Sequence, residues 1–205
     1  CRELPQTSVG VAMFMDHRVG RTVLLSVAAH LDELQVPFFL MQGTALGAYR
    51  DHGFVPTERD IDLGILYEQL WPRAGDIVKR LTELRCELEV WVKPYARPRT
   101  IVAWLNGVKI ELVGLMRWRD KRFTTPPIHP SVTQRYALVH EADILEEQTQ
   151  IPLFERSFNI PLRIETYLER EYGPDWRTPK DDHVSRTRIY DFCEANKITD
   201  DEIMA

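Results

Sequence analysis

The sequence of 205 residues lacks the features that mark several large classes of protein. No apolar run approaches the ~18 residues that a membrane-spanning helix needs, and there is neither an internal repeat nor a low-complexity tract. Cysteine is scarce, and Cys1, Cys86 and Cys193 are far apart and match no metal-ligand spacing. We therefore expect no transmembrane segment in this chain, no repeat architecture and no cysteine-based metal site.

A surplus of positive charge is also missing, because the formal net charge is −5 at pH 7. A nucleic-acid-binding surface needs clustered Lys and Arg, so we expect no binding of bulk nucleic acid. Basic residues do gather locally in Arg97-Pro98-Arg99 and between Arg117 and Arg122. Small anionic ligands therefore stay open as partners.

The composition is that of a globular protein, with 44% apolar and 10% aromatic residues. A chain of this length fits one domain that buries roughly 70% of its unfolded-chain surface. We expect a single domain over residues 1–205, which could be part of a longer protein because no leader precedes Cys1. The compartment stays open between the cytoplasm, for a bacterial protein, and the secretory-pathway lumen, for a eukaryotic one. The sequence does not indicate an oligomeric state.

Apolar periodicity predicts alternating helices and strands in the first half of the chain. Residues 19–37 have helical spacing at Val23, Val27, Leu31 and Leu34, and we expect Pro37 to end that helix. The following segments are predicted in order: a strand at 38–41, a glycine turn, one or two helical turns at 44–50, a strand at 61–66 and a helix at 67–85.

Three β-rich runs follow, at residues 88–92, 100–105 and 108–115. The last two are joined by Asn106-Gly107, which is the strongest short signal for a hairpin. Residues 117–161 hold many prolines and little periodicity, so we expect loops and short pieces there. Residues 161–172 and 184–195 are predicted to be helical.

A pair of carboxylates is the main candidate for chemistry. Asp60 and Asp62 lie two residues apart in a predicted strand and so share one face, opposite to Ile61. Such a pair is repulsive unless a cation neutralises it, and Mg²⁺ or Mn²⁺ would satisfy both carboxylates. Glu111, on a later strand, is a candidate third acid, and it is either solvent-facing or beside a cation. A solvated strand edge is the alternative for Asp-x-Asp.

A phosphate-binding role is the hypothesis for several neighbours of these acids. Gly43-Thr44 follows an apolar strand, and a glycine there lets backbone N–H groups approach phosphate oxygens. Arg50 could grip a phosphate, or form a salt bridge with Asp51, Glu58 or another acid. Arg97 and Arg99 could line the nucleotide side or lie in a solvated loop. This arrangement suits a metal-dependent phosphoryl or nucleotidyl transferase.

Tyr172 and Trp176 are aromatic candidates near the end of the predicted helix at 161–172. Their rings could stack on a base or a sugar. Packing of the terminal helix against the domain is the alternative for both.

These residues carry a resemblance to a known family. Gly43–Arg50, Gly53–Pro56 and Asp60–Asp62 resemble the LicD and fukutin-related family of the nucleotidyltransferase superfamily, whose pattern runs roughly Gly-Thr-Leu-Leu-Gly-Ala-x-Arg, Gly-Phe-Ile-Pro and Asp-Ile-Asp. A second block is similar to the family's C-terminal signature, with Asn159–Leu162 followed by Tyr167-Leu168 and by Tyr172–Trp176 with Pro179. The resemblance covers about residues 38–180.

The resemblance implies an α+β fold in which helices flank a small mixed sheet. It implies transfer of a phospho-alcohol, such as phosphocholine or a polyol phosphate, from a CDP-linked donor to a glycan hydroxyl. Asp60, Asp62 and Glu111 would then be the catalytic acids and bind the metal. Gly43, Thr44, Arg50, Arg97 and Arg99 would bind substrate, as would Tyr172 and Trp176.

The chain departs from the family pattern at two places. Thr57-Glu58-Arg59 stands where the family usually has Trp-Asp-Asp, and the third acid is Glu111 where Asp is common. Two alternatives therefore stay open. One is a nucleotidyltransferase that acts on a small molecule or a protein, and the other is a catalytically inactive domain that binds a glycan or a nucleotide.

Overall fold

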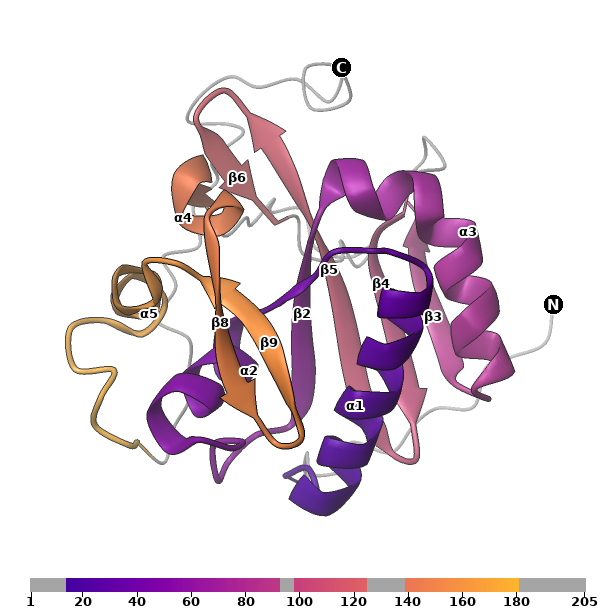
Figure 1. Ribbon diagram of the computed structural model, residues 1–205, viewed down its shortest axis with the longest axis horizontal. Coiled ribbons are helices and arrows are strands. Elements are labelled where there is room, and N and C mark those ends of the chain that lie inside the picture. Colours follow the sequence, from indigo (N-terminus) through magenta and orange to yellow (C-terminus); the bar gives the residue numbers. More distant parts are fainter. Residues whose placement is uncertain (1–13, 93–97, 125–138, 181–205) are drawn as a thin grey trace, which may run out of the picture.

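The computed structural model describes residues 14–92, 98–124 and 139–180. A mixed β-sheet forms its centre, two long helices lie on one face of the sheet, and a two-stranded hairpin lies beside the sheet's first strand (Figure 1). None of the described helices is both long and apolar enough to cross a membrane. The helix predicted at residues 184–195 lies outside the described residues.

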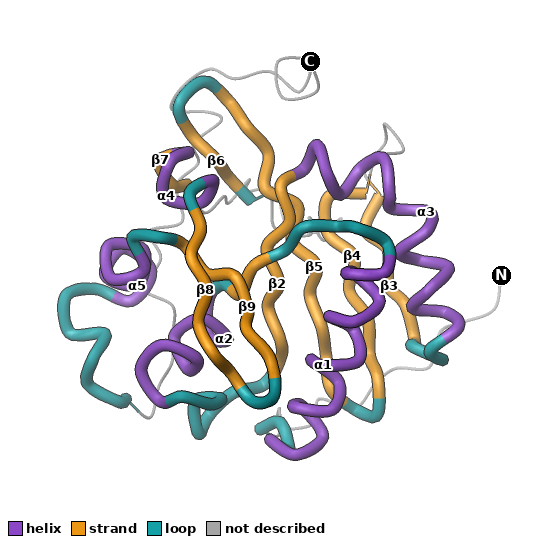
Figure 2. Tube along the Cα trace, viewed as in Figure 1, coloured by secondary structure: helices purple, strands orange, loops and turns teal. Residues whose placement is uncertain are grey.

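Two helices, α1 (His17–Glu33) and α3 (Tyr67–Glu83), cover the sheet. They contact each other, both contact strands β2 and β5, and Figure 2 shows both in front of the strands. Each presents an apolar stripe to the core, which in α3 consists of Leu70, Ala74, Ile77 and Leu81. The helical spacing in the sequence therefore identified the two helices that support the sheet.

The ends of α1 are set by local chemistry. Asp16 begins the helix, because its carboxylate accepts hydrogen bonds from two backbone N–H groups of the first turn. Val23, Val27 and Leu31 are buried as predicted. The helix ends at Glu33, and Gln35 then takes a left-handed conformation with φ 54°. The prediction that Pro37 ends the helix was wrong, because the chain has already turned before it.

The central sheet contains one parallel pair among antiparallel ones. Its strand order is β1 (Phe39–Leu40), β2 (Asp60–Leu66), β5 (Val108–Trp118), β4 (Pro98–Leu105) and β3 (Glu87–Val92). After β2 the chain passes through α3, β3 and β4 before β5 returns to pair with β2 in parallel. This order brings residues about 50 positions apart into direct register at the centre of the sheet.

The hairpin predicted at Asn106-Gly107 is confirmed. Leu105 pairs with Val108, and the two turn residues have φ 53° and 79°. Positive φ at both positions matches the twist of the flanking strands and suits Asn followed by Gly.

The structure agrees with the prediction of loops and short pieces across residues 117–161, as far as that range is described. That range contains β6 (Lys121–Phe123), β7 (Val139–Glu141), α4 (Ala142–Glu146), β8 (Gln148–Leu153) and β9 (Arg156–Pro161). These elements are short, and β6 and β7 extend β5 through pairing between distant segments, which a local pattern does not report. Pro161 ends β9, so the last described helix, α5 (Ile164–Tyr172), starts later than predicted.

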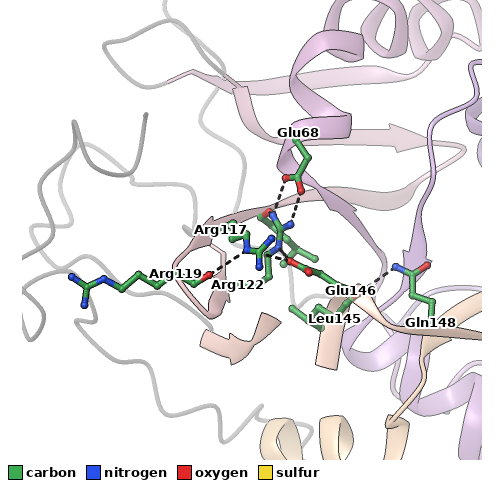
Figure 3. A network of polar contacts seen from close by, with 8 residues as sticks. Glu68, Arg117, Arg119, Arg122, Leu145, Glu146 and Gln148 are labelled. Carbon is green, nitrogen blue, oxygen red and sulfur yellow. Dashed lines mark hydrogen bonds and ion pairs between the residues drawn. The ribbon is translucent and has the colours of Figure 1, made fainter. Parts of the chain in front are cut away.

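A buried arginine joins these short elements to the sheet. Arg122 of β6 is 1% exposed and contacts Glu68 at the start of α3 with two of its nitrogens (Figure 3). Its Nε donates to Glu146 of α4 at 2.8 Å, and it also donates to the carbonyl oxygen of Leu115 at 3.1 Å. The guanidinium therefore connects α3, α4 and the end of β5.

Candidate functional site

The candidate site is built on the parallel pair of β2 and β5. In register, Asp60 lies opposite Lys109 and Asp62 lies opposite Glu111. Side chains two apart in a strand share a face, so all four lie on one face of the two central strands. The structure therefore brings together the three acids that the sequence singled out, although they come from distant parts of the chain.

A lysine lies among these acids. The ammonium of Lys109 is 3.1 Å from Asp60 Oδ2 and also contacts Glu111 Oε1. Burial alone would lower the pKa of Lys109, but the hydrogen bonds and charges of Glu111 and Asp60 outweigh burial and raise that pKa. Lys109 is therefore protonated and positively charged where it lies between two of the three predicted acids. The sequence showed that Lys109 and Glu111 share a strand face, but it did not show that Lys109 lies opposite Asp60.

In the sequence, Glu58 was a possible partner of Arg50 and a departure from the family pattern, whereas the structure places it beside Asp60 and Asp62. Its side chain is 7% exposed, and its Oε2 is buried without a hydrogen-bond partner. Burial, followed by the charge of Asp60, raises the pKa of Glu58 to about 8. The missed signal was its spacing, because Glu58, Asp60 and Asp62 recur at every second residue.

Asp62 is the most enclosed of the predicted acids, with 5% exposure. Burial raises the pKa of its carboxyl, and the charges of Asp60, Glu111 and Glu58 act in the same direction, opposed by Lys109. Its backbone N–H donates to Thr44 Oγ1 at 2.9 Å. Thr44 is itself fully buried, so the structure shows it anchoring β2. Its contact with a phosphate stays a prediction.

Two glycines allow close approach of chain segments around the site. A Cβ on Gly43, in the short helix α2 (Gln42–Leu46), would lie 2.6 Å from Glu58 Oε2. A Cβ on Gly47 would lie 2.5 Å from the carbonyl oxygen of Gly53. Gly43 thus gives the Glu58 carboxyl its place beside the predicted phosphate turn, whereas Gly47 lets the next turn pack against its own return segment.

Arg50 shows the salt-bridge alternative. It lies in a single π-helical turn, η1 (Gly47–Asp51), and donates to both carboxylate oxygens of Asp51 at 2.8 Å. A third donor reaches the carbonyl oxygen of Trp176 at 3.1 Å. Arg50 therefore ties the turn after α2 to the segment after α5, and its binding of phosphate stays a prediction.

The two aromatic candidates differ in exposure. Trp176 is 4% exposed and packs at a tilt against Tyr49, with ring centroids 5.9 Å apart. Its ring therefore offers no open face for stacking in this structure, and Trp176 packs against the domain, the alternative given for it from the sequence. Tyr172 is half-buried at the end of α5. Arg97 lies outside the described residues, and of Arg99 only the backbone, in β4, is described.

Tyr167 belongs to the C-terminal block of the resemblance, but no role at the site was predicted for it from the sequence, whereas the structure places it beside α2. Its side chain is fully buried, and its hydroxyl accepts a hydrogen bond of 2.8 Å from the backbone N–H of Gln42. Gln42 has φ 49°, a left-handed conformation directly before Gly43. Behind Tyr167 lies His140, whose Nε2 is 2.6 Å from Glu171 Oε1. The C-terminal block thus supports the start of α2.

The side chains of the site are of the type that binds a divalent cation, but in this structure the ammonium of Lys109 lies between two of them. Carboxylate oxygens are the ligands that Mg²⁺ prefers, and Glu58 contributes a buried oxygen without a partner. Across residues 14–92, 98–124 and 139–180, no group of three His, Cys, Asp or Glu side chains is arranged to hold a metal ion. The ammonium of Lys109 lies between Asp60 and Glu111.

A shallow groove of about 630 Å³ lies elsewhere, between α1 and the turn of the β8–β9 hairpin. Arg18, Arg21 and Phe154 are among its lining residues, and none of the predicted site residues is. Arg21 is paired with Glu155 across the groove. The groove is therefore separate from the carboxylate site.

Comparison with known proteins gives a family match over most of the site. The model of the family "LicD/FKTN/FKRP, nucleotidyltransferase domain" matches residues 35–162. That range contains the three predicted acids, Lys109 and Glu58.

Two curated relatives are similar over a shorter stretch. Ribitol-5-phosphate transferase FKTN from Mus musculus is 48% identical over 50 residues, which are 24% of this chain and 11% of that protein. The human protein of the same name is 48% identical over 46 residues, which are 22% of this chain and 10% of that protein. The aligned stretches thus span about a tenth of these relatives.

The fold also has solved neighbours. The lincomycin-bound crystal structure of the lincosamide antibiotic adenylyltransferase LnuA superposes with a TM-score of 0.50 at 13% identity, over 74% of this chain and 85% of that one. The likeness concerns the fold alone. It confirms the predicted class, a mixed sheet flanked by helices as in nucleotidyltransferases.

Proposed function

This chain belongs to the LicD/FKTN/FKRP nucleotidyltransferase-domain family, and from that membership we propose that it transfers a phospho-alcohol from a CDP-linked donor to a glycan hydroxyl. The observation that carries the proposal is the convergence of Asp60, Asp62 and Glu111 on one face of β2 and β5, with the buried Glu58 just before β2. A surplus of carboxylates at one place, with one buried oxygen unpaired, favours a cationic ligand or a metal-bound phosphate.

The reaction is an in-line displacement at phosphorus. The acceptor hydroxyl attacks the phosphorus that carries the alcohol, the bond from that phosphorus to the bridging oxygen breaks, and CMP leaves. A carboxylate of the site orients the hydroxyl and takes its proton. The donor class comes from the family, and the name of the FKTN relatives suggests ribitol 5-phosphate as one candidate group.

Asp60, Asp62 and Glu111 are the residues that would hold Mg²⁺ or Mn²⁺. The metal would supply positive charge to the donor phosphates in the transition state. The chain's own contribution is positional: Thr44 fixes the backbone of Asp62, and the pairing of β2 with β5 fixes Glu111 beside it.

A donor screen tests the proposal. Purified protein is incubated with Mg²⁺, candidate glycan acceptors and CDP-choline, CDP-ribitol, CDP-glycerol or a nucleoside triphosphate. We expect CMP from one CDP-linked donor, with the phospho-alcohol found on the glycan by mass spectrometry. Pyrophosphate from a triphosphate would instead support the nucleotidyltransferase alternative, and release of neither product would support a binding domain.

The matched variants are Asp62→Asn and Glu169→Gln. Asp62→Asn changes one oxygen for nitrogen inside the site, and we expect the rate of CMP release to fall at least about a hundredfold. Glu169 is an exposed acid on α5, so its replacement should leave the rate unchanged. An Asp62→Asn protein with full activity would remove the site from the proposal.

A further inference from the structure

We propose that Lys109 is the resident cation of the carboxylate site, that a divalent metal ion displaces its ammonium from Asp60 and Glu111, and that the displaced ammonium then binds the donor phosphate. The second step rests on the proposed function, whereas the first depends only on the site. Lys109 would thus be a phosphate-binding residue that also sets the affinity for the metal.

The position of Lys109 is the first observation. It lies directly opposite Asp60 in the parallel register, and it shares a strand face with Glu111, two residues further along β5. Its ammonium lies 3.1 Å from Asp60 Oδ2 and also contacts Glu111 Oε1. A cation in this place contacts two of the three predicted metal ligands, so it and a metal ion compete for the same oxygens.

The balance of charge is the second observation. Asp60, Asp62 and Glu111 carry three negative charges when ionised, and Lys109 returns one positive charge. The remaining two match the charge of one divalent ion. Glu58 adds a fourth carboxyl whose buried Oε2 has no hydrogen-bond partner. Lys109 therefore neutralises the site only in part, which keeps the carboxylates together without saturating them.

The freedom of Lys109 to move is the third observation. Its side chain is 34% exposed, more than Asp60 at 26% or Glu111 at 20%. A lysine carries a compact charge on a flexible four-carbon stem, so the ammonium can leave the carboxylates without unfolding the strand. A phosphate bound to a metal at these carboxylates would lie within reach of that stem.

A second lysine in the molecule shows what a purely structural pair looks like. Lys121 also contacts two carboxylates, those of Asp120 and Glu141, on the β6–β7 side of the sheet. Asp120 is 75% and Glu141 39% exposed, so neither acid beside this lysine is enclosed. Lys121→Met is therefore a matched control, because it removes the same charge from a similar pair outside the site.

The test is metal binding without donor. The affinity for Mg²⁺ is measured by calorimetry and that for Mn²⁺ by loss of the free-ion electron paramagnetic resonance signal. Since one competing charge is removed at close range, we expect Lys109→Met to bind both ions on the order of tenfold to a hundredfold more tightly than the wild type. Lys121→Met should bind them as the wild type does. Equal affinities in the wild type and Lys109→Met, or no binding in either, would overturn the proposal.

Lys109→Arg keeps the test valid if Lys109→Met does not fold. Arginine retains the charge and offers more donors to the two carboxylates, so we expect weaker metal binding than in the wild type. Tighter binding by this variant would contradict competition.

The donor arm separates this proposal from the proposed function. With metal saturating, Lys109→Met should raise the KM for the active CDP-linked donor by about tenfold or more, while Lys121→Met leaves it unchanged. If the wild type is inactive with every donor, the proposed function is contradicted, but the result on metal binding is not affected. An active Lys109→Met with an unchanged KM would overturn the phosphate-binding step.

Discussion

The carboxylate site and the Arg122 cluster both enclose charge, but they balance it differently. Around Arg122, two carboxylates and a carbonyl oxygen face one guanidinium, and all three of its nitrogens donate hydrogen bonds (Figure 3). At the carboxylate site, the single ammonium of Lys109 contacts two of the four acids, and one buried oxygen of Glu58 has no partner. The Arg122 cluster therefore holds α3, α4 and β5 together. At the carboxylate site the acids repel one another, and a cationic ligand would reduce that repulsion.

This difference explains why one cluster points to function. A buried ion pair is tolerated when its hydrogen bonds are satisfied, and an excess of like charge in one place destabilises the fold that holds it. The Glu58 carboxyl shows that cost, because its pKa is raised to about 8 by burial and the neighbouring Asp60. Changes that remove a charge should therefore have opposite effects in the two clusters.

The largest effect is expected for Arg122→Met. This change removes the main partner of Glu146, and it removes the ion pair by which Glu68 of α3 contacts β6. Glu68 is 51% and Glu146 29% exposed, so water can partly replace the lost partner. Hydrogen bonds to charged groups contribute about 1.5–3 kcal/mol, and we expect a loss of about 2–3 kcal/mol in the free energy of unfolding, measured in urea. Arg117→Met is the matched control, because Arg117 is 57% exposed and lies 3.6 Å from Glu146. Similar losses in both variants would show that Arg122 has no special role.

A pair of amide substitutions compares the clusters directly. Asp62→Asn removes a charge from the crowded site, and we expect the metal-free protein to gain about 1–2 kcal/mol in its free energy of unfolding. Glu68→Gln removes a charge from the balanced cluster, and its partial exposure limits the expected loss to about 1 kcal/mol. Urea unfolding in EDTA measures both. The same sign in both variants would contradict the comparison.

A third comparison concerns the pH dependence of stability at the carboxylate site. The pKa of Glu58 rises from an ordinary value of 4.5 to about 8 on folding, so between these values the folded protein keeps a proton that the unfolded chain has lost. Stability therefore falls as pH rises through this window, by up to about 1.4 kcal/mol per pH unit for this group.

Glu58→Gln cannot titrate, and we expect a shallower decline between pH 5 and pH 8, the window set by the raised pKa of Glu58. Urea unfolding of the metal-free protein at several pH values measures the slope. Glu169→Gln is the control, because Glu169 is exposed and outside the site. Equal slopes in Glu58→Gln and the wild type would show that Glu58 is not the group responsible.

The helices, the hairpin and the acidic strand could be predicted from local pattern. Val23, Val27 and Leu31 are buried at the expected spacing, and Asn106-Gly107 turns between β4 and β5. The individual strands of residues 117–161 could not be predicted in this way, because β6 and β7 depend on pairing with distant strands. Likewise, the hydrogen bond from Arg50 to the carbonyl oxygen of Trp176 joins two distant segments, and no spacing in the sequence predicts it.

The sequence by itself determined which side chains could do chemistry. Asp60 and Asp62 share a face because side chains alternate along a strand, and the family pattern around them is readable in order. Only the tertiary structure decided the charge around them, because the parallel pairing of β2 with β5 sets Lys109 beside Asp60 and Glu111 beside Asp62. The pairing follows from the chain returning through α3, β3 and β4 to the centre of the sheet. Electrostatic interactions depend on distance in space, so that return decided which charges lie beside these acids.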